Sequence, residues 1–66
     1  MKNQTTYRVD LGDLTVLATY PSGETYDLNA DGEPCTSTDD LRALITELQH
    51  VGYYSAAEAR RLAETV

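Results

Sequence analysis

The chain has 66 residues, enough for one small domain, and a domain of this size buries only about 60 % of the surface that its unfolded chain exposes. A deep substrate cavity would reduce that limited burial further, so we expect a protein that works through its outer surface and is not an enzyme. The formal net charge of -6 argues against direct binding of nucleic acid, and it favours cations or Lys- and Arg-rich protein surfaces as partners.

Residues 5–28 alternate polar and apolar side chains with the period of two that half-buried strands require. Gly12 and Asp13 interrupt the pattern once, and Pro21 to Glu24 have the composition of a reverse turn, so three strands are expected in an antiparallel meander. The side chains expected to face the core are Tyr7, Val9, Leu11, Leu14, Val16, Ala18, Tyr20, Tyr26 and Leu28. Those expected on the opposite, polar face are Thr6, Arg8, Asp10, Thr15, Leu17, Thr19, Thr25 and Asp27.

The period changes to that of a helix after residues 29–37, an acidic segment rich in Asp, Gly, Pro and Ser that is expected to be a loop. A first helix is predicted over 38–51, with Ser37 or Thr38 as its N-cap and Gly52 at its end. Its apolar stripe is Leu41, Leu44, Ile45 and Leu48. A second helix is predicted over 55–65, because Ser55 and Glu58 have the spacing of a capping box. Its inner face is Ala59, Leu62, Ala63 and Val66.

The order of these elements predicts an α+β domain, βββαα, spanning residues 1–66, in which a helical hairpin covers one face of the sheet. The longest apolar run, Val16 to Ala18, is far too short to cross a bilayer, and nothing near Met1 resembles a signal peptide. Cys35 is the only cysteine, which excludes an internal disulfide and fits a reducing compartment. We therefore expect a cytoplasmic protein, either a monomer or a weak homodimer paired through an exposed edge strand.

The segment Asp27-Leu28-Asn29-Ala30-Asp31-Gly32 resembles the first half of the EF-hand calcium loop, D-x-N-x-D-G. The resemblance implies a calcium site with Asp27, Asn29 and Asp31 as side-chain ligands and the carbonyl of Glu33 as a backbone ligand. The twelfth position, however, is Thr38 where the family has a bidentate Glu, and a strand is expected before the loop instead of a helix. The alternative is a polar turn that satisfies its own backbone groups.

The other reactive residue types show no catalytic or metal-binding pattern. His50 has no Cys or His at metal-ligand spacing and is expected to interact with the end of the first helix. Cys35 lies among carboxylates, which disfavour its thiolate. Arg60 and Arg61 are too few for a nucleic-acid footprint and are expected to complement the end of the second helix. No catalytic residue and no cofactor are therefore predicted.

The most informative feature is an uninterrupted acidic window between Val9 and Leu41, which contains no Lys or Arg. Its carboxylates are Asp10, Asp13, Glu24, Asp27, Asp31, Glu33, Asp39 and Asp40. We expect folding to gather them on one face, where they resemble the repeating charge of a nucleic-acid backbone and bind a groove lined with Lys and Arg. Exposed Tyr residues would add contact area.

In size and charge the chain resembles the small acidic inhibitors that phages encode against host nucleic-acid enzymes, including anti-CRISPR proteins and DNA mimics. The likeness covers the whole chain and involves no shared motif, so it assigns no role to any residue. It implies a stoichiometric inhibitor that blocks a basic surface of a host defence or DNA-handling complex, for example a CRISPR effector. The alternative is a small calcium-binding module organised by the loop from Asp27 to Gly32.

Overall fold

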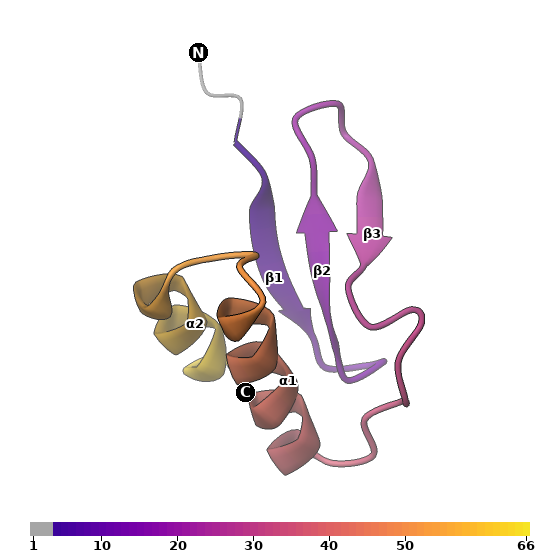
Figure 1. The fold of residues 1–66 in the computed structure, drawn as a ribbon. Helices are drawn as coiled ribbons and strands as arrows, with labels where there is room; N and C mark the ends of the chain where they lie inside the picture. The colour runs from indigo at the N-terminus through magenta and orange to yellow at the C-terminus, as the bar shows by residue number, and fades with distance from the viewer. Residues whose placement is uncertain (1–3) are drawn as a thin grey trace.

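A computed structural model describes residues 4–66 and confirms the predicted α+β fold (Figure 1). The strands β1 (Thr6–Asp10), β2 (Thr15–Thr19) and β3 (Thr25–Asp27) form one antiparallel sheet in the order β1-β2-β3. Two helices follow, α1 (Thr38–His50) and α2 (Ala56–Ala63). The element order is the one predicted, and α2 ends at Ala63 instead of residue 65.

Both helices begin at serine caps. The hydroxyl of Ser37 accepts a hydrogen bond from the backbone N–H of Asp40, at 3.1 Å, and that of Ser55 accepts one from the N–H of Glu58, at 3.2 Å. Each bond satisfies one of the free amides at a helix start. The predicted capping box is only half formed, because the carboxylate of Glu58 pairs with Arg61 instead of returning to Ser55.

Helix α1 ends in the way that Gly52 predicts. Gly52 has a φ of 103°, a left-handed conformation that strains other residues. Its N–H donates to the carbonyl of Gln49 and the N–H of Tyr53 donates to the carbonyl of Leu48, which is the Schellman pattern. The chain can thus reverse direction and place Tyr53 beside the sheet. Neither helix of the described residues 4–66 combines the length and apolar character that crossing a bilayer requires.

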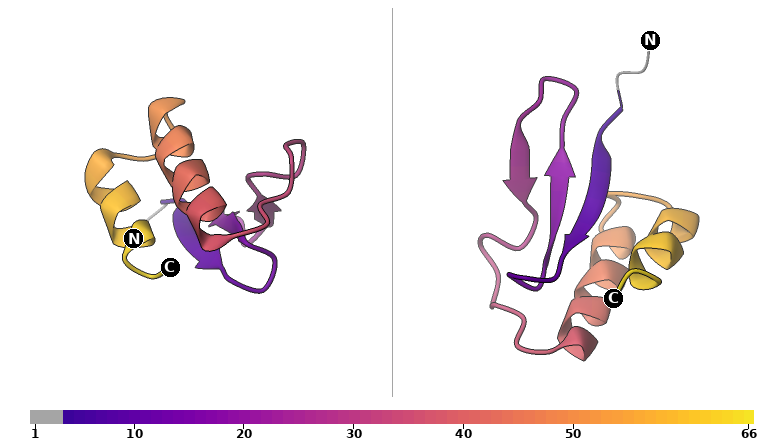
Figure 2. Two further views of the ribbon diagram at one scale, coloured as in Figure 1. Left: turned by 90° about the horizontal axis from the view of Figure 1, so that it is seen from below. Right: turned by 180° about the vertical axis from the view of Figure 1, so that it is seen from behind.

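The core lies between the two helices and one face of the sheet (Figures 1 and 2). Helix α1 packs on β2 and α2 packs on β1. The buried side chains that join these layers are Val16, Leu41, Ile45, Leu48, Ala59 and Leu62. They come from the predicted inner faces of β2 and of both helices, which confirms these parts of the predicted core.

The helices cover only part of the sheet, and this overturns three predicted core positions. Figure 1 shows that the β2–β3 turn projects beyond the helices, and within the described part of the chain β3 packs only against β2. Tyr20 and Tyr26 are therefore 36 % and 47 % exposed although they share a sheet face with Ala18. Leu11 lies in the β1–β2 turn and is 53 % exposed, because β1 ends at Asp10.

Thr15 is a correction in the other direction. It lies on the predicted polar face, yet it is only 3 % exposed. Its hydroxyl donates to the Asp27 carboxylate at 2.6 Å, and it lines a small hollow together with residues of the loop that follows β3. The loop covers Thr15, and the bond to Asp27 satisfies the hydroxyl that this coverage removes from water.

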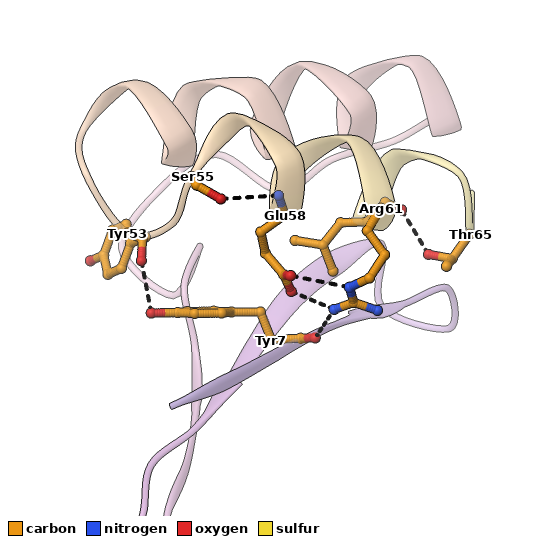
Figure 3. A network of polar contacts seen from close by, with 7 residues as sticks. Tyr7, Tyr53, Ser55, Glu58, Arg61 and Thr65 are labelled. Atoms are coloured by element: carbon orange, nitrogen blue, oxygen red, sulfur yellow. Dashed lines mark hydrogen bonds and ion pairs between the residues drawn. The ribbon is translucent and has the colours of Figure 1, made fainter. Parts of the chain in front are cut away.

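A polar network joins α2 to the outer edge of β1 (Figure 3). Arg61 pairs with the carboxylate of Glu58 and donates to the carbonyl of Tyr7 at 2.9 Å. The hydroxyl of Tyr7 in turn donates to the carbonyl of Tyr53 at 2.9 Å. Arg61 thus lies in the last turn of α2, as predicted, but it also bridges to the sheet. This bridge occupies a carbonyl on the β1 edge that another strand would need for pairing.

The core packing predicts a large difference between two identical substitutions. Leu41→Ala removes a fully buried side chain and should cost about 2–5 kcal/mol. Leu11→Ala acts on a side chain that is 53 % exposed and should stay within about 0.5 kcal/mol of the parent. Urea unfolding followed by circular dichroism measures both. Similar losses in the two variants would contradict the described core.

Candidate functional site

A groove of about 750 Å³ separates α1 from β3 and the loop after it. The helix contributes one wall and the loop residues 28–35 contribute much of the other. Five acidic residues line the groove: Asp27, Asp31, Glu33, Asp40 and Glu47. The carboxylate of Asp27 is directed to the other face of the sheet, where it accepts from Thr15. Among the described residues 4–66, no Lys or Arg lines it. The groove is thus a concave surface with charge of one sign, and such a shape focuses the field of its carboxylates.

Aromatic rings line the same groove beside the carboxylates. They belong to Tyr20, Tyr26 and Tyr53, and Val51 lies with them. The rings of Tyr20 and Tyr26 meet edge to face, with centroids 5.0 Å apart. Exposed aromatic side chains are enriched at protein interfaces, so the three tyrosines make this concave surface a candidate binding site.

Four of the eight acidic residues predicted to form the site line the groove: Asp27, Asp31, Glu33 and Asp40. The other four do not line it. Asp10 accepts hydrogen bonds from the backbone N–H groups of Gly12 and Asp13 in the β1–β2 turn, at 3.0 and 3.3 Å. Asp13 lines the small hollow of about 220 Å³ that also contains Thr15.

The two remaining carboxylates have local partners. Asp39 pairs with Arg42 at 3.3 Å on the exposed side of α1. Glu24 accepts a hydrogen bond from the Tyr26 hydroxyl at 2.7 Å, near the β2–β3 turn. Figure 1 shows that this turn and the β1–β2 turn lie at opposite ends of the sheet. The acidic window therefore does not form one continuous face, and its central part is what folding gathers.

Sequence reasoning missed Glu47 and did not say which tyrosines would be exposed. Glu47 lies outside the acidic window, but a second stripe on α1 contains it: Asp40, Ala43, Leu44, Glu47 and Val51. These residues have helical spacing and all line the groove. This mixed stripe of acidic and apolar residues could have predicted that Glu47 lies in the groove. Only the purely apolar stripe beside it, which faces the core, was predicted.

Three groups that line the groove have shifted pKa values. The hydrogen bond between the Tyr26 hydroxyl and Glu24 raises the pKa of Tyr26. The N–H and the hydroxyl of Thr36 donate to the carboxylate of Asp40 at 3.0 and 2.9 Å, and these bonds lower the pKa of Asp40. Asp40 therefore keeps its negative charge in mild acid. Burial raises the pKa of the Cys35 thiol, and the nearby carboxylates of Asp40 and Asp27 raise it further. The expected disfavouring of the thiolate is confirmed, with burial as the larger cause.

Hydrogen bonds within a polar turn hold the segment that resembles a calcium loop. Asp27 accepts from the hydroxyl of Thr15 and from the N–H of Asn29, at 2.6 and 2.8 Å. The side-chain amide of Asn29 donates to the carbonyl of Glu33 at 2.8 Å, and that carbonyl is one of the ligands implied by the resemblance. A Cβ on Gly32 would come within 2.3 Å of the Asn29 side-chain oxygen, so a larger residue here would have to displace the Asn29 side chain. No group of three or more His, Cys, Asp or Glu side chains within residues 4–66 is arranged to hold a metal ion.

The bonds to Asp40 predict that Thr36→Ala raises the pKa of this carboxyl towards its usual range, since one of its donors is lost. A lowered pKa in the folded state stabilises the fold above the unfolded-state pKa, and this contribution is lost as the pH falls through the lowered value. The variant should therefore be less stable at neutral pH and equal to the parent in strong acid. Carboxyl NMR titration and unfolding at several pH values measure both effects. Thr46→Ala is the control, because the hydroxyl of Thr46 donates to the backbone carbonyl of Arg42 and not to a carboxylate.

The turn bonds of Asp27 and Asn29 predict no effect of calcium on thermal stability. A ligand that binds only the folded state raises the melting temperature. Thermal scans with millimolar calcium and with millimolar magnesium should thus coincide. A rise in calcium alone would favour the calcium-binding alternative.

Comparisons of the chain with models of known families, with curated proteins and with solved structures find no match.

Proposed function

We propose that the protein is a non-enzymatic binding protein whose acidic groove binds a Lys- and Arg-rich surface of a protein that handles nucleic acid. The observation that carries this proposal is the lining of the groove, with five acidic residues, three tyrosines and no Lys or Arg among residues 4–66. Occupation of the basic surface blocks nucleic acid from the same place. Nucleic acid itself is repelled by a net charge of -6.

The charges of the groove are available to a partner. The carboxylates of Asp31 and Glu33 are on exposed residues and accept no hydrogen bond from other described residues. Asp40 stays ionised because Thr36 donates to it. Carboxylates without internal cationic partners gain most from an external guanidinium or ammonium group. Association should be fast at low salt, because complementary fields steer the encounter.

The size of the chain suffices for this function. A typical specific interface buries about 800 Å² on each partner. The whole chain exposes 4516 Å², so an interface of that size would use less than a fifth of its surface. Inhibition would be stoichiometric, because the inhibitor acts by occupying the surface. The resemblance to phage anti-CRISPR proteins and DNA mimics supports a host defence or DNA-handling complex, for example a CRISPR effector, as the partner.

Charge reversal inside and outside the groove tests the proposal. Asp31→Lys combined with Glu33→Lys should weaken partner binding at least about tenfold, because like charges placed together across an interface are costly. Asp27 is left unchanged, since its bonds to Thr15 and Asn29 hold the loop. Glu64→Lys, which changes an exposed residue at the end of α2, should have little effect.

The measurement has two stages. The immobilised chain first captures its partner from a lysate of the source or its host, and increasing salt elutes it for identification by mass spectrometry. Affinities of the variants are then determined at two salt concentrations, and binding by the parent should fall steeply as salt rises. Equal binding by the groove variant and the Glu64→Lys control would count against an acidic binding groove.

A further inference from the structure

The three tyrosines of the groove form an exposed aromatic shelf, which we define as Tyr20, Tyr26 and Tyr53. Tyr26 and Tyr53 are 47 % and 44 % exposed, and Tyr20 is 36 % exposed. Tyr20 and Tyr26 belong to the β2–β3 hairpin, Tyr53 follows the end of α1, and all three line the groove. Val51 beside it is 65 % exposed. Exposed rings grouped in a hollow next to charges mark an interaction site more clearly than single exposed apolar residues do.

The shelf contrasts with the remaining pair of tyrosines in the chain. Tyr7 and Tyr54 also meet edge to face at 5.0 Å, but they pack against the core. The hydroxyl of Tyr54 donates to the carbonyl of Ile45 at 2.8 Å, and burial raises the pKa of Tyr54 to about 12. Ala18 on the central strand pairs with Tyr7 on one side and Tyr26 on the other. The Tyr7–Tyr54 pair thus packs against the core, whereas the Tyr20–Tyr26 pair is exposed.

Local contacts order the rings of Tyr20 and Tyr26 and the backbone of Tyr53. The Tyr26 hydroxyl donates to the carboxylate of Glu24 at 2.7 Å, and the edge of one ring rests on the face of another in the Tyr20–Tyr26 pair. The backbone of Tyr53 is fixed through its carbonyl, which accepts from the hydroxyl of Tyr7 (Figure 3). Rings that are already ordered lose little entropy when a ligand binds.

We propose that the aromatic shelf binds an arginine side chain of the basic partner. A guanidinium group is planar and weakly hydrated, so it can stack on a tyrosine ring while its N–H groups donate to a carboxylate. Glu24 lies at the shelf, and Glu47 lines the same groove. No Arg or Lys of the described chain occupies this place. A lysine ammonium group also contacts a ring face, but it is not planar and is more strongly hydrated, so the shelf prefers arginine while the carboxylates attract either cation.

This inference rests on the proposed function, but it has its own test. The probes are hexa-arginine and hexa-lysine peptides with blocked ends, which carry the same charge. They are titrated into the isotope-labelled chain at one salt concentration and followed by two-dimensional NMR. Hexa-arginine should bind about two- to fivefold more tightly than hexa-lysine, which is the range of an exposed cation–π contact. Its largest shifts should fall on Tyr20, Tyr26 and Tyr53.

Variants separate the shelf from the carboxylates. Tyr26→Leu should abolish the preference for arginine and weaken hexa-lysine binding much less than hexa-arginine binding. The fold should be kept, since this exposed ring makes no contact that the core needs. Tyr26→Phe, which keeps the ring and loses only the hydroxyl, should retain the preference and serves as the matched control. Asp31→Lys should weaken both peptides by the same factor, so that their ratio is maintained.

Four results would overturn the arginine site. The first two are equal affinity of the two peptides for the parent and a preference for arginine that survives Tyr26→Leu. The third is that neither peptide binds. The fourth is that resonances of the shelf move when the chain is diluted without peptide, which would show that the shelf binds a second copy of the chain. Each leaves the proposed function to be decided by the Asp31 and Glu33 reversals, because those act on the carboxylates alone.

Discussion

The contact between the stripe of Leu41, Ile45 and Leu48 and the central strand β2 sets the shape of the rest of the molecule. Helix α1 packs on β2, and α2 packs on the neighbouring strand β1. No third helix follows within the described residues, so β3 and the loop after it keep an open face towards α1. The groove is the space that results from placing two short helices on three strands. A chain of 66 residues can therefore have a concave surface without a cavity inside its small core.

The chemistry of this groove follows from which residues its two walls contain. The loop brings aspartate and glutamate because acidic, glycine-rich segments form turns, and α1 adds Asp40 and Glu47 from a stripe beside its apolar face. Carboxylates grouped in this way repel one another and lower the stability of the folded chain. A basic partner relieves that repulsion, so the same charges that weaken the isolated domain favour the complex.

The tyrosines link the fold to the proposed binding surface. Tyr7 belongs to the polar network that fastens α2 and the α1–α2 connection to β1, and this network places Tyr53 beside the groove. Tyr26 lies opposite the same alanine as Tyr7 but beyond the helices, so its ring remains exposed. Tyrosine is amphipathic, so it suits both the core and the exposed surface. In either place its ring packs against neighbours and its hydroxyl forms a hydrogen bond.

The sequence by itself determined the elements, their order and the caps of the helices, because strand and helix periods, serine caps and Gly52 are local signals that act over a few residues. It also placed the core stripe of α1 and the acidic composition of the loop. Only the tertiary structure decided which of these residues meet. Whether Thr15 is covered and Tyr26 is exposed depends on where a distant loop and two helices end, and alternation along a strand carries no such information. For the same reason the acidic window is divided between the groove, two turns and the exposed side of α1. The two turns of a three-stranded meander lie at opposite ends of the sheet, so they separate carboxylates that are close in sequence.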